Sequence, residues 1–136
     1  MRHNKSLNDR ERLLAIKWYA QQIIDFNKNK TFSEFVSDYR TNFASVFAIE
    51  QMGANVKETT EATQERHRDI PWREIYGMRN RIAHNYDGIN MDLIWGVIKE
   101  DLPELVAQID KILETDLKLT NDTNNKKVNF KKNLRR

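Results

Sequence analysis

The chain has 136 residues, a length typical of one domain with a single hydrophobic core. It contains no cysteine, which excludes disulfide frameworks and thiolate chemistry. The formal net charge is +3, but residues 119–136 hold six basic residues and one acidic residue, so the rest of the chain carries −2. Global charge therefore gives no argument that the folded part binds nucleic acid. No apolar run is long enough to span a bilayer, and we expect a soluble, cytoplasmic protein without membrane contact.

The first half of the chain predicts two helical regions, each opened by a capping box. Asn8 and Glu11 open a helix that ends near residue 27, and Thr31 and Glu34 open a region that continues to about residue 58. A break is expected near residue 40. Gly53 lies inside the second region, where a glycine costs about 1 kcal/mol relative to alanine. We therefore expect close helix packing at Gly53.

Aromatic residues are more numerous in the second region than one small helix needs for its own core. Two interpretations stay open for them, a buried core and a subunit interface. The residues are Phe32, Phe35, Tyr39, Phe43 and Phe47.

Residues 70–88 predict a further amphipathic helix, because apolar residues recur there at helical spacing. Pro71 suits the first turn, and Gly88 is expected to stop the helix in a left-handed cap conformation. His84 therefore lies in or just past the last turn, where the helix dipole favours a protonated imidazole.

The spacing inside this helix limits which side chains can meet. Asn80 and His84 share a face as an i,i+4 pair, and Arg79 and Tyr86 are nearly in register. Arg79 and His84 are about 140° apart on an ideal helix. They converge only if the backbone departs from helix near His84, or if two copies of the segment meet across an interface. The simpler alternative is a surface helix whose arginines provide solubility.

A last helix is expected to begin near Asn90 or Met91 and to end near Thr115, with a kink or restart at Pro103. No period-two pattern of strands is present, so the sequence predicts an all-α antiparallel bundle of four or five helices. We place the helical domain at residues 1–117 and a flexible, basic, polar tail at residues 118–136. The tail is interpreted either as an arm that contacts RNA or a partner, or as a solubilising segment.

The run IPWREIYGMRNRIAHNY, residues 70–86, contains an Arg, four residues, a His, one residue and a Tyr. These are Arg79, His84 and Tyr86. Together with Ile94-Trp95 and the later DLPEL run, the pattern resembles the HEPN superfamily, in particular its HepT-like ribonuclease toxins, over roughly residues 8–115. Where that family often has Ile-Gly-Glu-Ala, this chain has Met-Gly-Ala-Asn at residues 52–55, so the acidic residue is absent.

The resemblance implies a homodimeric HEPN-type bundle and a metal-independent endoribonuclease, with two Arg/His sets in one cleft. It also implies that a partner nucleotidyltransferase antitoxin, using ATP, attaches AMP to Tyr86. The added phosphate would compete with RNA for Arg79. An ordinary packing role at the helix end is the alternative for Tyr86.

The residues themselves allow metal-free acid–base chemistry on RNA. The sequence lacks Cys/His clusters, paired carboxylates beside His84 and Gly-rich phosphate loops, so we expect neither a metal site nor a cofactor. RNA supplies its own nucleophile, the 2′-OH; His84 can remove or return a proton, and Arg79 can hold the phosphate. Asn80 and Arg81 are expected to support these two residues. Arg73 and Arg81 are expected to contact RNA.

The expected substrate is tRNA or mRNA, and the expected products are a 2′,3′-cyclic phosphate and a 5′-OH. Two other functions stay open. One is a non-catalytic nucleotide- or RNA-binding subunit that partners a nucleotidyltransferase. The other is a structural helical module whose aromatic face binds another protein.

Overall fold

The computed structural model describes residues 7–121, and over this range every regular element is helical. The all-α fold predicted from the sequence is therefore confirmed. The longer helices are α1 (Asp9–Phe26), α3 (Tyr39–Glu58), α5 (Trp72–His84) and α7 (Leu102–Thr115). The shorter elements are α2 (Phe32–Ser37), α4 (Glu61–Arg66), the 3₁₀ turn η2 (Tyr86–Gly88), α6 (Met91–Gly96), the π-helical turn η3 (Val97–Asp101) and α8 (Leu117–Asn121).

Local capping chemistry sets the boundaries in the first half of the chain. The backbone N–H of Glu11 donates to Asn8 Oδ1 at 2.8 Å, and the Asn8 N–H donates back to the Glu11 carboxylate at 2.9 Å. Thr31 and Glu34 make the same reciprocal pair at the start of α2. The break expected near residue 40 occurs at Asp38, whose carboxylate accepts a backbone N–H from the first turn of α3. Both predicted capping boxes are therefore present.

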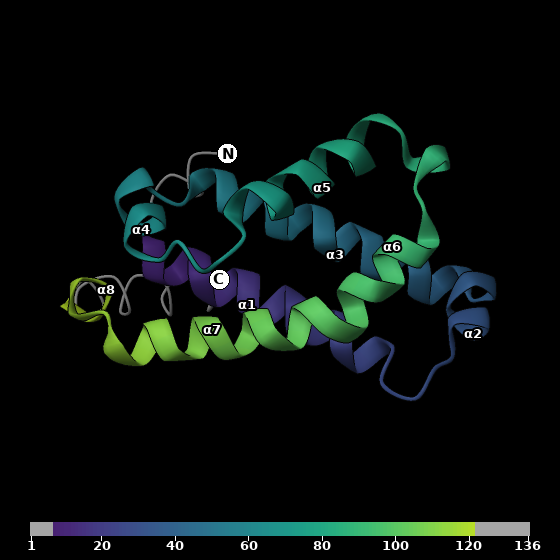
Figure 1. The fold of residues 1–136 in the computed structure, drawn as a ribbon, viewed down its shortest axis with the longest axis horizontal. Helices are drawn as coiled ribbons and strands as arrows, with labels where there is room; N and C mark the ends of the chain where they lie inside the picture. The colour runs from purple at the N-terminus through teal and green to yellow at the C-terminus, as the bar shows by residue number, and fades with distance from the viewer. Residues whose placement is uncertain (1–6, 122–136) are drawn as a thin grey trace, which may run out of the picture.

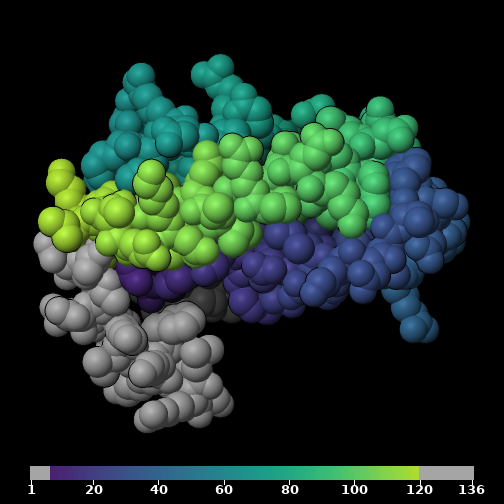
Figure 2. Space-filling view, turned by 60° about the horizontal axis from the view of Figure 1, so that its bottom comes forward, coloured from purple at the N-terminus to yellow at the C-terminus, as the bar shows by residue number. Residues whose placement is uncertain are grey.

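Successive long helices run antiparallel to one another and form one bundle (Figure 1). α3 packs against both α1 and α5, and α7 packs against α1. In Figure 2 the green strip from α6 to α7 runs along the length of the molecule, between α1 and the α4–α5 side. Each fully buried apolar side chain contributes roughly 1.5–3 kcal/mol to holding these helices together. The most deeply buried are Leu13, Ile16, Ile23, Phe35, Met52, Ile94, Ile98 and Ile109.

The last long helix contains the expected restart at Pro103. α6 begins at Met91, as predicted, and Asn90 is its N-cap. The helix then widens into the π turn, in which the N–H of Leu102 donates to the carbonyl oxygen of Val97. α7 follows with Pro103 in its first turn, where a missing N–H leaves no helical hydrogen bond unmade.

From the sequence we place the boundary between the helical domain and the tail after residue 117. Helix α8 (Leu117–Asn121) spans that boundary. Leu119 is only 3% exposed and belongs to the hydrophobic core, so the packed part of the chain extends past residue 117. The rest of the predicted tail, residues 122–136, lies outside the described residues. Within the described range, none of the helices has the length and apolar character required to cross a membrane.

Candidate functional site

Helix α5 carries the predicted site and lies along α3. It begins at Trp72. Pro71 was expected in the first turn but is the N-cap residue, one position before the helix. The indole Nε1 of Trp72 donates to the backbone oxygen of His67 at 2.9 Å. Because the ring is also largely buried, this bond fixes the start of α5 to the preceding loop.

Arg79 packs against α3 at Gly53. A Cβ atom built on Gly53 would overlap both Cβ and Cγ of Arg79, so only a glycine allows this approach. The close helix packing predicted at Gly53 is therefore confirmed. It places the root of the arginine side chain against the backbone of α3.

The guanidinium of Arg79 forms one hydrogen bond and keeps one buried donor without a partner among the described residues. Its Nη1 donates to Asn80 Oδ1 at 3.3 Å. Its Nε is buried and has no hydrogen-bond partner among the described residues. An unpaired buried donor costs about 1–3 kcal/mol, and more when it belongs to a charged group. The site therefore presents a cationic donor that an anionic oxygen would satisfy.

His84 is the last residue of α5, and its side chain is exposed. The helix is regular through His84, so the backbone departure that would turn this residue toward Arg79 within one copy does not occur. No hydrogen bond joins the two side chains in the described part of the chain. Asn80 lies between them, since it bonds Arg79 and shares a helix face with His84.

Asn85 is the residue that follows the last residue of α5, and its extended φ of −157° takes the chain out of the helix. The N–H of Gly88 then donates to the carbonyl oxygen of Asn85 at 3.2 Å and closes the turn η2. No described residue has a positive φ, so the left-handed cap predicted at Gly88 is wrong. The physical reason is that Asn85 and the 3₁₀ turn already reverse the chain, and no left-handed residue is needed.

Tyr86 begins this turn and is half-buried against α3. Its ring meets the ring of Phe43 edge-on, with 5.9 Å between centroids. Desolvation raises the pKa of the Tyr86 hydroxyl, and the negative charge of Asp87 adds to this. The side chain therefore stays a neutral phenol at physiological pH.

The aromatic residues of α2 and α3 divide between core and surface. Phe35 is fully buried, and Phe32 is half-buried; both contact Trp95. The other three lie one turn apart on one side of α3 and are 67%, 55% and 58% exposed: Tyr39, Phe43 and Phe47. We term these three the aromatic face. The buried-core interpretation is therefore confirmed for Phe35, and the interface interpretation of the aromatic face stays a prediction.

The aromatic face borders the predicted site. Between α3 and α5 lies a shallow groove of about 300 Å³, which Phe43 and Phe47 line from the α3 side. Ile82, Ala83 and Tyr86 line it from the α5 side. The end of α5 and the exposed aromatic rings therefore form one continuous surface.

Arg73 and Arg81 are both exposed on α5. No carboxylate within residues 7–121 forms an ion pair with either of them. Arg68, on the preceding loop, instead pairs with Glu65 at 2.6 Å. Arg73 and Arg81 are thus exposed arginines without an ion pair among the described residues.

His67 does not join the site. Its Nε2 lies 2.6 Å from Asp116 Oδ2, and Arg66 Nε donates to the same oxygen at 3.1 Å. Burial alone would raise the pKa of Asp116, but the hydrogen bonds from His67 and Arg66 outweigh it and lower that pKa to about 2. These contacts tie α4 to the end of α7 and have a structural role. No group of three or more His, Asp or Glu side chains suited to a metal ion occurs between residues 7 and 121.

Phe43 is the site residue that the sequence reasoning did not assign. The signal was available, because residues 39, 43 and 47 repeat every four positions on a stripe separate from the core stripe of Val46 and Ile49. The contact with Tyr86 joins residues 43 positions apart and follows only from the tertiary structure.

Comparison with known proteins gives a family for the chain. The model of the family described as "Ribonuclease HepT-like" matches residues 16–112. "Putative RNase TTE0752" of Caldanaerobacter subterraneus is 36% identical over 94 residues, which is 69% of this chain and 84% of that protein. "Probable ribonuclease HepT" of Thermococcus cleftensis is 33% identical over 90 residues, which is 66% of this chain and 82% of that protein. No solved structure gives a significant match. The match of the family model over most of the chain places this protein in the HepT-like ribonuclease family.

Proposed function

We propose that this protein is a metal-independent endoribonuclease that cleaves RNA by attack of a 2′-OH on the adjacent phosphodiester. The 2′ oxygen bonds to phosphorus and loses its proton, while the bond from phosphorus to the 5′ oxygen breaks and that oxygen gains a proton. The products are a 2′,3′-cyclic phosphate and a 5′-OH. Membership of the HepT-like family and the names of the relatives support ribonuclease activity.

Arg79 and His84 carry the chemistry in this proposal. The observation that supports it most is the buried, unpartnered Nε of Arg79, because a phosphate oxygen would supply the missing acceptor in a charge-assisted bond. His84 is exposed at the C-terminal end of α5, where it can take or return the proton of a bound RNA. Asn80 orients the guanidinium. Arg73 and Arg81 bind phosphates beyond the cleaved bond.

The active form in this proposal is a homodimer that pairs through the aromatic face. Three exposed aromatic rings on one side of one helix are a large apolar area for a small monomer. Burying them against a second copy gains roughly 25 cal/mol per Å². Because the same surface includes the end of α5, pairing brings a second Arg79 and His84 close to the first set.

The proposed control is transfer of AMP to Tyr86 by a nucleotidyltransferase antitoxin. The phenol oxygen attacks the α-phosphorus of ATP, pyrophosphate leaves, and the phenol proton is lost to a base. Tyr86 follows His84 by two residues, so the new phosphate adds negative charge beside the arginines that bind RNA. Incubation with such an enzyme and ATP should add the mass of AMP to the wild type and not to Tyr86→Phe.

Purified protein, an end-labelled RNA and EDTA provide the test. Arg79→Ala and His84→Ala should each lower the cleavage rate by about 10²–10⁴-fold, the range expected when a general acid–base or an electrostatic group is removed. Arg68→Ala removes an exposed arginine outside the site and should leave the rate unchanged. RNA binding without cleavage by the wild type would contradict the proposal and would favour the non-catalytic RNA-binding subunit.

A further inference from the structure

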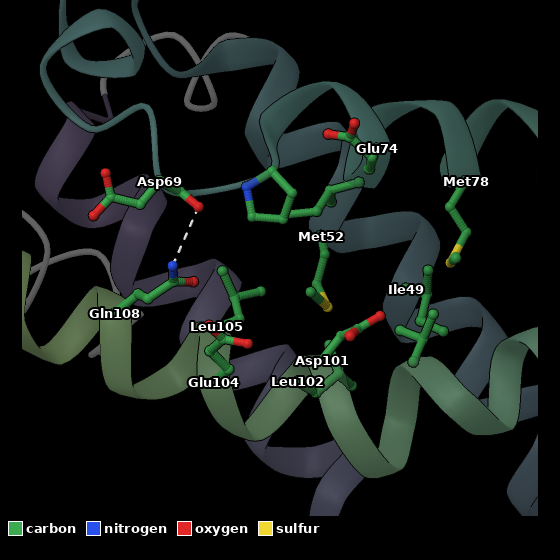
Figure 3. A pocket seen from close by; sticks show the side chains of 13 residues that line it. Ile49, Met52, Asp69, Glu74, Met78, Asp101, Leu102, Glu104, Leu105 and Gln108 are labelled. Atoms are coloured by element: carbon green, nitrogen blue, oxygen red, sulfur yellow. Dashed lines mark hydrogen bonds between the residues drawn. The ribbon is translucent and has the colours of Figure 1, made fainter.

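A second groove lies between α3, α5 and α7 (Figure 3). Ile75 and Met78 line it from the α5 side, whereas neither Arg79 nor His84 lines it. The groove has a volume of about 280 Å³. Its floor is apolar and is made by Ile49, Met52, Ile75, Met78, Leu102 and Leu105.

The rim of this groove is acidic. Asp69 and Glu74 stand on one wall, and Asp101 and Glu104 stand on the other (Figure 3). All four are exposed, and no Lys, Arg or His lines the groove. None of the four forms an ion pair with another described residue. An apolar floor inside four unpaired carboxylates suits a segment that is both basic and apolar.

The chain itself contains such a segment beyond the described residues. Residues 126–136 read KKVNFKKNLRR, with six cations and no acid. Three apolar residues are interspersed among the cations: Val128, Phe130 and Leu134. The sign of the charge and the mixture of residue types both complement the groove.

The segment is long enough to return to the groove. α7 runs from the groove at Leu102 to Thr115, a length of about 20 Å at 1.5 Å per residue. Nine residues, 122–130, separate Asn121 from the far side of Phe130 and span up to about 30 Å when extended. The apolar floor also has room for a phenyl ring, because a buried cavity of about 150 Å³ is sufficient to bind benzene.

We propose that residues 126–136 dock in this groove of their own chain, with Phe130 on the apolar floor and the lysines and arginines against the four carboxylates. Docking neutralises the acidic rim and withholds the cations of the tail from RNA. Neither proposed catalytic residue lines this groove, and the docking does not depend on nuclease activity.

Photo-crosslinking in the full-length protein tests the docking directly. Phe130 is replaced by a photoreactive benzoylphenylalanine, and the crosslinked peptides are identified by mass spectrometry in a His84→Ala background, so that RNA cleavage plays no part. Crosslinks are expected on the segments 75–78 and 102–105. Asp101→Lys with Glu104→Lys should lower their yield about tenfold, and 1 M salt should lower it as well.

The matched control is Glu100→Lys with Glu114→Lys, which reverses two exposed carboxylates that do not line the groove and should keep the yield. Asp101→Asn with Glu104→Gln preserves side-chain shape and should give an intermediate yield, which keeps the test valid if the lysine pair does not fold. Crosslinks elsewhere, no crosslinks, or equal yields in the two lysine pairs would overturn the proposal. Crosslinks between ¹⁵N-labelled and unlabelled copies would also overturn it, because they would place the tail on a second chain.

Discussion

Gly53→Ala tests whether the position of Arg79 depends on close contact between α3 and α5. The added Cβ would overlap the first two carbons of the Arg79 side chain, which cannot rotate away as the end of a flexible side chain could. Overpacking of this kind costs about 1–3 kcal/mol. Alanine also gains about 1 kcal/mol over glycine as a helix former. The net loss of unfolding free energy should therefore lie between zero and about 2 kcal/mol.

Gly96→Ala separates the two contributions. Gly96 has helical φ and ψ of −60° and −43°, and a Cβ there meets nothing within 4 Å, so only the helix-forming gain should appear. Urea unfolding at one protein concentration should place Gly53→Ala about 1–3 kcal/mol below Gly96→Ala. Cleavage should fall by up to about 100-fold in Gly53→Ala, since a displacement of about 1 Å at a catalytic group has that effect. Equal stability and equal activity of the two variants would show that packing of Arg79 on Gly53 does not fix the position of Arg79.

Three further changes address the rest of the structure. Asp116→Asn removes the negative charge that faces His67 and Arg66 and leaves a neutral amide. Because the folded pKa of Asp116 is lowered from 3.8 to about 2, the stabilisation from this carboxylate is present above pH 3.8 and is lost as the pH falls toward 2. The pH dependence of the urea midpoint should flatten over that window in Asp116→Asn, and an unchanged slope would argue against the network. Phe47→Glu on the aromatic face should convert the dimer to monomer in light scattering, whereas Leu117→Glu, at a 70% exposed leucine outside that face, should not; a dimeric Phe47→Glu would exclude this interface. Asn80→Ala should lower cleavage by about 10-fold, the value of one lost hydrogen bond, and full activity would show that Asn80 does not position the guanidinium.

The helix boundaries that the sequence predicted are those set by local chemistry. The capping boxes at Asn8 and Thr31 and the break at Asp38 need only residues within one turn, and all three occur where expected. The restart at Pro103 was predicted for the same reason. The π turn before it was not, because its widened hydrogen bonding leaves no side-chain signature.

Predictions from the sequence were wrong, or could not be made, where a tertiary contact determines the local structure. The polar residues after Thr115 suggested a tail, yet Leu119 packs into the core and extends the fold into α8. A left-handed Gly88 was a reasonable expectation from the dipeptide Asp-Gly, but the geometry at Asn85 made it unnecessary. The four carboxylates of the groove are spread over residues 69–104, so no local pattern brings them together.

The sequence named the residues of the candidate site, whose roles stay a prediction, but it did not predict their tertiary contacts. Arg79, His84 and Tyr86 were identified from spacing and resemblance, and α5 does carry the first two. That Arg79 lies against Gly53 and bonds Asn80, and that Tyr86 lies on Phe43, depends on the pairing of α5 with α3.

The chemical ends of the cleaved RNA test the proposed reaction most directly. A short RNA is digested in EDTA, and the masses of its fragments are measured beside those of a DNA of the same sequence. Attack by the 2′-OH predicts 2′,3′-cyclic phosphates on the upstream fragments, 5′-OH groups on the downstream fragments, and an intact DNA. Fragments that carry 5′-phosphate and 3′-OH, or a cleaved DNA, would contradict the mechanism, because water and not the 2′-OH would then be the nucleophile.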